Sequence, residues 1–317
     1  MVNTIIKRLL SVIPILLIVS ITLFILMNVL PGDAAAGIVS SDMPPEIAEQ
    51  IREELGLNRP VVIRYLDWMG GIVIGDFGVS LINKQPVIEK IALRLPVTFE
   101  LTMLSMLIAV LFSLPAGIIS AVKRNSLLDV FTSFFSMVGV AMPPFWLGML
   151  LVLFFSVILG CLPASGYVHF SVNPSENLLR MIMPCITVAV ALTATIMRQT
   201  RSALLDVLDE DYIVTAKAKG LTKLVVVVRH ALRNALIPVI TVIAMQVGRF
   251  FAGAVIAETV FALPGIGREI VDGILSRDYP VVMGMVLIVA IIIVFINTLV
   301  DIFYIILDPR ISIENKR

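Results

Sequence analysis

The chain has 317 residues and a formal net charge of +1, and 59% of its residues are hydrophobic while 15% are charged. Soluble domains are about 45 to 50% apolar, so this composition indicates an integral membrane protein. The near-neutral charge argues against binding of nucleic acid, which requires a concentrated basic face. Cys161 and Cys185 are the only cysteines, and neither has a Cys or His at metal-site spacing. A disulfide framework and a cysteine metal site are therefore excluded.

The first apolar run covers residues 9–30. At about 1.5 Å per residue it is long enough to cross a hydrocarbon core of about 30 Å. A cleaved signal peptide is the alternative, because Ala34, Ala35 and Ala36 have the small side chains of a cleavage site. Signal peptides have an apolar region of only roughly 7 to 15 residues, however. The pattern thus favours a retained N-terminal transmembrane helix over residues 1–30.

Residues 31–98 form a segment of different composition, with charges of both signs among proline, glycine and asparagine. Apolar residues recur at four-residue spacing over 47–55, which predicts a short amphipathic helix. A second helical pattern covers 61–74 and carries Tyr65 and Trp68, residues that favour a membrane boundary. We expect an extracytoplasmic segment with short amphipathic helices and no transmembrane span.

Five further apolar spans follow, and together with the first they predict an all-α membrane protein with six transmembrane helices. The five spans cover residues 99–122, 130–159, 181–197, 235–257 and 281–307. They make up a five-helix core over 99–307, followed by a short tail over 308–317. An even number of spans places both termini on the same side of the membrane.

The distribution of basic residues indicates which side that is. Most of the lysines and arginines lie near the two termini, at 123–124 and within 198–238, whereas the short loops of the other side hold only Arg180, Arg268 and Arg277. Cytoplasmic loops carry the excess of positive charge. Both termini, the tail and the segment 198–238 are therefore predicted to be cytoplasmic.

The segment 198–238 is the most charged stretch between two apolar spans. From Asp206 onward its acids precede its bases, an order that suits a helix dipole. Tyr212, Ala216 and Gly220 are spaced four apart, which predicts that they share one face of a helix. Because two of these residues are small, we expect a shallow face that another surface can approach closely.

This segment resembles the EAA loop of binding-protein-dependent ABC importer permeases, in their dipeptide, oligopeptide and nickel branch. The resemblance rests on Asp211 and Tyr212, on 215–221 and on 229–238, although the literal Glu-Ala-Ala is absent. Similar segments recur along nearly the whole chain, at residues 55–60, 75–80, 143–148, 162–166, 264–267, 277–282 and 307–311. The alternative is an ordinary solvated cytoplasmic loop.

The resemblance implies a type I ABC importer permease fold, with one extra N-terminal helix added to a five-helix core. It also implies that 198–238 forms a short coupling helix that docks on an ATPase subunit. The residues it assigns to this coupling loop are Asp211, Tyr212, Ala216, Lys217, Ala218, Gly220, Asn234 and Pro238. Pro238 lies inside an apolar span, where its missing N–H predicts a hinge or merely a tolerated kink.

The resemblance further implies the partners. They are a second homologous permease, two ATPase subunits, an extracytoplasmic solute-binding protein, a peptide substrate and the lipid bilayer of a bacterial or archaeal cytoplasmic membrane. No cofactor would be bound by this chain, since ATP and Mg²⁺ would sit on the ATPase subunits. A nickel or metal-chelate importer of the same family is the alternative for the cargo.

Motifs of catalysis are absent from the sequence, which has no G-x-x-x-x-G-K-[ST], H-E-x-x-H or G-x-S-x-G. We therefore expect a transport subunit with no catalytic residues and no metal site. Polar residues inside the spans are few, and Gln246 and Arg249 are the candidates for a substrate pathway. Structural pairing of Arg249 with an acid such as Glu258 is the favoured alternative. A secondary transporter would require more ionisable groups at mid-membrane.

Overall fold

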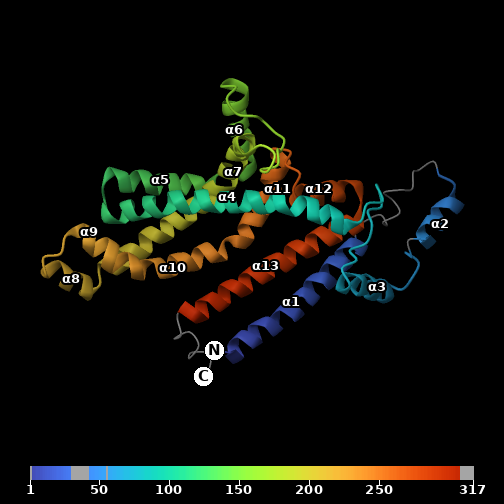
Figure 1. The fold of residues 1–317 in the computed structure, drawn as a ribbon, viewed down its shortest axis with the longest axis horizontal. Coiled ribbons are helices and arrows are strands. Elements are labelled where there is room, and N and C mark those ends of the chain that lie inside the picture. Colours follow the sequence, from blue (N-terminus) through green and yellow to red (C-terminus); the bar gives the residue numbers. More distant parts are fainter. Residues whose placement is uncertain (1, 30–42, 55, 308–317) are drawn as a thin grey trace. The chain divides into compact units, whose positions relative to one another are not determined.

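The computed structural model describes residues 2–29, 43–54 and 56–307, without the side chains of 2–9, 45, 48, 51, 54 and 301–307 (Figure 1). These residues are almost entirely helical, and within them the only β-type pairing is one isolated bridge between Val79 and Pro86. The predicted start of the extracytoplasmic segment, with Ala34 to Ala36, and the predicted tail 308–317 lie outside the described residues. The expected all-α fold is confirmed.

The chain divides into two compact units, and the first contains the described parts of Met1–Val97 and Pro264–Arg317. Its helices are α1 (Val2–Val29), α2 (Pro45–Glu54), α3 (Val61–Val73), the first turns of α4 (Val87–Val122), α12 (Ile266–Ser276) and α13 (Tyr279–Leu307). The helices α1 and α13 run side by side (Figure 1). The core forms where Val87 and Ile91 of α4 pack on Val281 and Met285 of α13.

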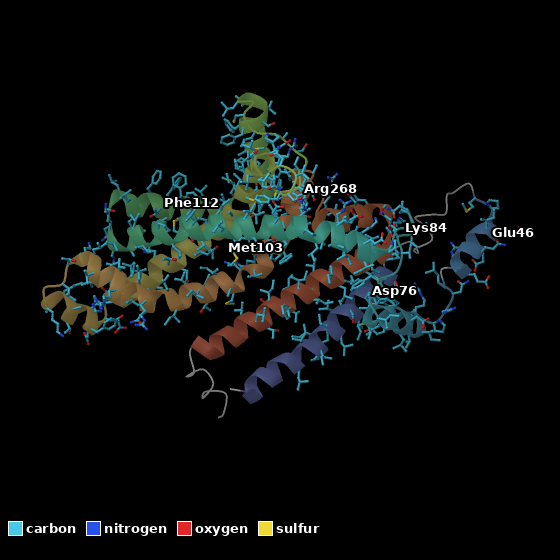
Figure 2. All side chains as sticks on the ribbon, viewed as in Figure 1. Glu46, Asp76, Lys84, Met103, Phe112 and Arg268 are labelled. Atoms are coloured by element: carbon cyan, nitrogen blue, oxygen red, sulfur yellow. The ribbon has the colours of Figure 1, made fainter. Side chains whose placement is uncertain are left out.

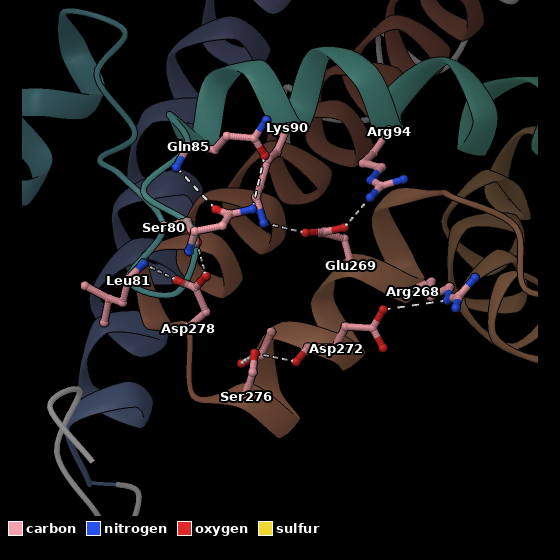
Figure 3. Close-up of polar contacts among 12 residues, drawn as sticks. Ser80, Leu81, Gln85, Lys90, Arg94, Arg268, Glu269, Asp272, Ser276 and Asp278 are labelled. Carbon is pink, nitrogen blue, oxygen red and sulfur yellow. Dashed lines mark hydrogen bonds and ion pairs between the residues drawn. The ribbon is translucent and has the colours of Figure 1, made fainter. Parts of the chain in front are cut away.

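Polar contacts fix the start of α4 against the helix pair α12 and α13 (Figure 3). The carboxylate of Asp278 accepts hydrogen bonds from the hydroxyl of Ser80 and, at 3.0 Å, from the N–H of Leu81. Glu269 binds the ammonium of Lys90 at 2.8 Å and the guanidinium of Arg94 at 3.0 Å. These contacts tie the turn before α4 and its first three turns to the C-terminal half of the unit.

Because of this pairing, α4 begins at Val87, well before the position predicted for its span. The sequence analysis predicted a segment without a transmembrane span up to residue 98. In the structure the last residues of that segment, including Lys90 and Arg94, belong to the first turns of α4, where Glu269 pairs with both bases. The helix also continues through Pro96, at the cost of one backbone hydrogen bond.

The second unit, Thr98–Leu263, is built around α7 (Pro174–Leu208). The helices α5 (Leu127–Ala141), α6 (Pro144–Leu151), α10 (Leu232–Met245) and α11 (Val247–Val260) all contact α7. The N-terminus of α7 is capped by Asn173, whose Oδ1 accepts a hydrogen bond at 3.2 Å from the N–H of Glu176, and Pro174 suits the first helical position. The helix is 35 residues long, so it extends beyond the predicted span 181–197 at both ends.

The predicted span 130–159 is not one straight helix. Helix α5 ends at Ala141. Helix α6 and the π-helix η2 (Val152–Ile158) then form one continuous segment, whose axis lies at 105° to the axis of α5. Prolines 143 and 144 are the physical reason. A residue before proline is forced into extended conformation, and Met142 and Pro143 accordingly have ψ angles of 121° and 131°. The span is therefore bent where two consecutive prolines exclude helix.

The predicted span 235–257 is also divided. Helix α10 runs through Pro238 without interruption, and the break lies at Gln246, where the chain turns before α11 begins. Upstream, the short helix α9 (Lys223–Val225) and the π-helix η3 (Val226–Ala231) lead directly into α10. The irregular backbone thus lies on both sides of Pro238 and not at the proline itself.

Five helices among the described residues are long and apolar enough to cross a membrane, and they become six if the bent pair of α5 with α6 and η2 counts as one span. Large apolar side chains cover their outer surfaces. On α4, for example, Met103 and Phe112 project outward from the helix (Figure 2). The expected multi-pass membrane architecture is confirmed.

Helix α4 approaches α7 most closely at Gly117. A Cβ atom there would lie 2.7 Å from the carbonyl oxygen of Met197 and 2.7 Å from Cβ of Thr200. We expect Gly117→Ala to lower the free energy of unfolding by about 1 to 3 kcal/mol, because the two helices must separate. Thermal unfolding of the purified protein measures this. Gly70→Ala on α3 is the control, since a Cβ there meets no atom within 4 Å. Equal melting temperatures for the two variants would contradict the close approach.

Candidate functional site

The charged segment 198–238 is mostly helical and is not a loop. It contains the last turns of α7, the short helix α8 (Asp211–Ala218), the helices α9 and η3, and the first turns of α10. Only the turns at 209–210 and 219–222 lie outside helices. The predicted short helix is therefore present as α8, which lies between these two turns.

Helix α8 has one face packed against its own unit and one face exposed. Ile213 is completely buried and Ala216 is only 7% exposed, so these two residues hold the helix in place. Tyr212 and Val214 are 41% and 56% exposed, and Lys217 and Ala218 are exposed as well. A partner that approaches α8 thus meets the outer face and cannot reach Ala216.

The expectation that Tyr212, Ala216 and Gly220 share one helical face is wrong. The helix ends at Ala218, and Gly220 lies beyond it with φ +79°, in the left-handed region. Glycine adopts this conformation without steric cost, which explains its place directly after a helix. Gly220 therefore terminates α8 and directs the chain toward α9.

Two separate parts of the sequence motif meet in the structure. The side-chain amide of Asn234, on α10, donates a hydrogen bond of 2.8 Å to the hydroxyl of Tyr212, on α8. Asp211 lies in the first turn of α8 and Lys217 in the last, so both charges complement the helix dipole as expected. The contact between Tyr212 and Asn234 joins α8 directly to a membrane-spanning helix.

Residues that the sequence analysis did not select anchor this end of the unit. Arg201 of α7 binds both carboxylate oxygens of Asp129, at 2.7 and 2.9 Å, and so links α7 to α5. The ammonium of Lys223 donates to the carbonyl oxygen of Val122 at 3.0 Å, which links α9 to the end of α4. Bidentate pairs of this kind add geometric specificity as well as energy.

A sequence signal for one of these anchors does exist. Ser126 caps the N-terminus of α5 by accepting a hydrogen bond from the N–H of Asp129. The pattern of a serine followed three residues later by an acid is a known helix start. It predicts where Asp129 lies, but nothing in the sequence indicates that Arg201, which lies far along the chain, is its partner.

The second candidate site contains Gln246 and Arg249. Gln246 is buried at the break between α10 and α11. Arg249 is exposed and lines a pocket of about 350 Å³ together with residues of α5, α6 and α7. The pocket wall is apolar apart from Arg249 and Thr195, as its other residues are Val140, Pro144, Val188, Ala191, Leu192, Ala252, Gly253 and Ile256. A cationic group thus stands at the edge of an apolar pocket.

Arg249 does not pair with Glu258, contrary to the favoured expectation. Glu258 is completely buried and accepts a hydrogen bond of 2.6 Å from the hydroxyl of Thr98. Among the described residues, Arg249 makes no ion pair with any carboxylate.

The described residues contain no cluster of three or more His, Cys, Asp or Glu side chains that is arranged to hold a metal ion. Within this part of the chain the two cysteines lie apart, since Cys161 is exposed and Cys185 is buried.

Comparison with known proteins identifies the family of the chain. Residues 113–313 match the family described as "Binding-protein-dependent transport system inner membrane component", and residues 1–102 match the N-terminal region of the same kind of membrane component. Together the two matches cover nearly the whole chain, including the segment that contains α8.

Relatives of full length are similar over both units. The oligopeptide transport system permease protein AppB of Bacillus subtilis is 41% identical over 311 residues, which are 97% of this chain and 98% of AppB. The glutathione transport system permease protein GsiC of Escherichia coli K12 is 40% identical over 311 residues, 98% of this chain and 99% of GsiC. These findings confirm the resemblance seen in the sequence, and the chain belongs to the family of binding-protein-dependent transport system inner membrane components.

Proposed function

We propose that this protein is the transmembrane permease subunit of an ATP-driven importer for peptides. The similarity of about 40% over practically the full length to permeases of oligopeptide and glutathione transport systems is the observation that supports it. Both of these cargoes are peptides. The chain itself serves as a transport subunit, and ATP with Mg²⁺ is bound and hydrolysed by separate ATPase subunits.

The proposed assembly contains a second homologous permease, two ATPase subunits and an extracytoplasmic solute-binding protein. The family description, which names a binding-protein-dependent system, supports the last of these. The excess of lysine and arginine near both termini and over 198–238 supports a cytoplasmic location for these regions. This orientation places α8 on the side of the membrane where ATP is available.

The outer face of α8 is the proposed docking surface for an ATPase subunit. Tyr212, Lys217 and Ala218 are exposed there, while Ile213 and Ala216 fix the helix to its own unit. A force on this helix has two routes into the membrane part. One is the hydrogen bond from Asn234 to Tyr212, which leads to α10, and the other is the contact of Lys223 with the end of α4.

The pocket beside Arg249 is the proposed contact of the transported peptide. A guanidinium binds a carboxylate with two parallel hydrogen bonds, and the apolar wall suits the side chains of a peptide. Pro238 is proposed to ease bending of α10, together with the irregular backbone at η3 and Gln246.

Import of nickel or a metal chelate is the weaker candidate. The relatives reported above transport peptides by name, and the described residues offer no metal-ligand cluster in support of it. A secondary transporter is disfavoured because the family is named for its dependence on a binding protein.

Purification of this chain from its native membrane tests the proposal as a whole. We expect a second permease and two ATPase subunits to co-purify, and ATP hydrolysis by the complex to rise when the solute-binding protein and peptides are added together. Recovery of the chain alone, with peptide uptake that depends on a proton gradient and not on ATP, would reject the proposal.

Two neighbouring alanines of α8 allow a matched test of docking. In a variant whose exposed Cys161 is replaced by serine, we expect Ala218→Cys, labelled with a maleimide–benzophenone reagent, to be joined to an ATPase subunit on illumination, because Ala218 faces outward. Ala216→Cys is the control and should give little product, since Ala216 is buried. Product bands on denaturing gels measure both. Equal yields, or no product at Ala218 in an intact complex, would show that the outer face of α8 is not the docking surface.

The role of Arg249 is tested by uptake of peptides with a free or an amidated C-terminus. We expect Arg249→Gln to lower uptake of the free-carboxylate peptide about tenfold, because one charge-assisted contact is lost. Uptake of the amidated peptide should be nearly unaffected. The melting temperature should change little, because Arg249 is exposed and forms no ion pair within the described residues. A large loss of stability with an unchanged ratio of the two uptakes would assign Arg249 a structural role.

A further inference from the structure

A second pocket lies in the first unit, far in sequence from the coupling and pathway residues. It encloses about 410 Å³ and lies between the end of α1, the turn before α3, helix α3 and the start of α13. Its apolar wall includes Phe24, Met27, Leu57 and Met283, and its polar wall includes Arg64 and Trp68. The pocket thus combines an apolar side with hydrogen-bond donors.

Helix α3 is fixed to α1 by aromatic contacts that form one side of this pocket. The rings of Tyr65 and Trp68 lie 5.5 and 5.9 Å from the ring of Phe24, and the hydroxyls of Tyr65 and Ser20 are 2.9 Å apart in a hydrogen bond. The opposite face of α3 is apolar and uncovered, with Val62 and Leu66 69% and 61% exposed. An apolar outer face with tyrosine and tryptophan beside it is typical of a helix at a membrane interface.

Two donors of α3 in the pocket have no hydrogen-bond or carboxylate partner within the described part of the chain. Arg64 stands over the ring of Phe24 at 6.0 Å and pairs with no described carboxylate, while the neighbouring Arg59 is paired with Asp67 at 3.3 Å. Burial lowers the pKa of Arg64, so its positive charge is partly desolvated, and no described carboxylate balances it. The indole N–H of Trp68 is buried and makes no hydrogen bond.

Arg64 and Trp68 are spaced four residues apart, so their side chains lie on the same face of α3. One unpaired guanidinium and one unpaired N–H donor on a common face are suited to the oxygens of a single anionic group. A guanidinium is the side chain that best matches the geometry of a phosphate or carboxylate. The apolar wall beside them requires that this anionic group carry a hydrocarbon part.

We propose that this pocket binds the phosphate group of a membrane phospholipid, held by Arg64 and the N–H of Trp68, with an acyl chain lying along α1 and α13. Its position supports a lipid as the occupant, because Phe24 and Met27 lie in the last turns of one apolar span and Met283 in the first turns of another. The pocket therefore stands where the headgroup layer meets the hydrocarbon of the bilayer. The bound lipid would hold α3 flat on the membrane surface.

The proposal is tested on the purified full-length permease after delipidation, by titration with phosphatidylglycerol. Native mass spectrometry counts the bound lipid molecules. In a Trp146→Phe variant Trp68 is the only tryptophan, so its fluorescence reports occupancy of this pocket. We expect the phospholipid to bind saturably. Diacylglycerol with the same acyl chains should not bind at this site, because it lacks the phosphate. Saturation of the Trp68 signal by inorganic phosphate, without retained lipid, would overturn the assignment to a phospholipid.

Variants distinguish binding of lipid in this pocket from non-specific binding of lipid to the protein surface. We expect Arg64→Gln to weaken the first phosphatidylglycerol bound about tenfold, since one charge-assisted contact is lost. By mass spectrometry Trp68→Phe should weaken it about threefold, because the ring contact with Phe24 is kept and only the N–H is removed. Lys84→Gln removes an exposed lysine outside the pocket and should leave the affinity unchanged. Wild-type affinity in both pocket variants would refute the proposal, and none of these measurements depends on transport activity.

Discussion

The ion pair between Asp129 and Arg201 is the contact on which the arrangement of the candidate coupling end depends. It joins the start of α5 to the last turns of α7, the helix around which the second unit is built. Arg201 lies ten residues before the start of α8 at Asp211, in the last turns of α7, so the position of α8 depends on where the end of α7 is held. Lys223 also contacts the end of α4, so α4, α5 and α7 together support the short, exposed helix α8.

Pairing within the protein also satisfies charges in other parts of this apolar chain, where water is not available to satisfy a polar group. Glu269 accounts for both Lys90 and Arg94, and Glu258 accepts a hydrogen bond from Thr98. Arg64 and Arg249, like the exposed Arg229 and Arg233, pair with no described carboxylate. Arg64 and Arg249 each line a pocket, which is why each is assigned an external anionic partner.

The sequence was sufficient for the all-α membrane fold, the count of spans and the short helix α8, because hydropathy and charge are local properties. It failed where distant residues decide the outcome. The pairing of Lys90 with Glu269 lets α4 start at Val87, and the burial of Ala216 depends on how α8 packs. The break at Gln246, which lies inside an apolar run without proline or glycine at that position, has no local signal that we can identify.

The division of α8 into a fixed inner face and a free outer face has an evolutionary consequence. Substitutions of Ile213 or Ala216 disturb the packing of the unit, whereas Val214, Lys217 and Ala218 can vary without cost to the fold. In the docking proposed above, recognition between the permease and an ATPase subunit would therefore diverge through a few outward side chains of α8, while the packing of this helix on its own unit is preserved.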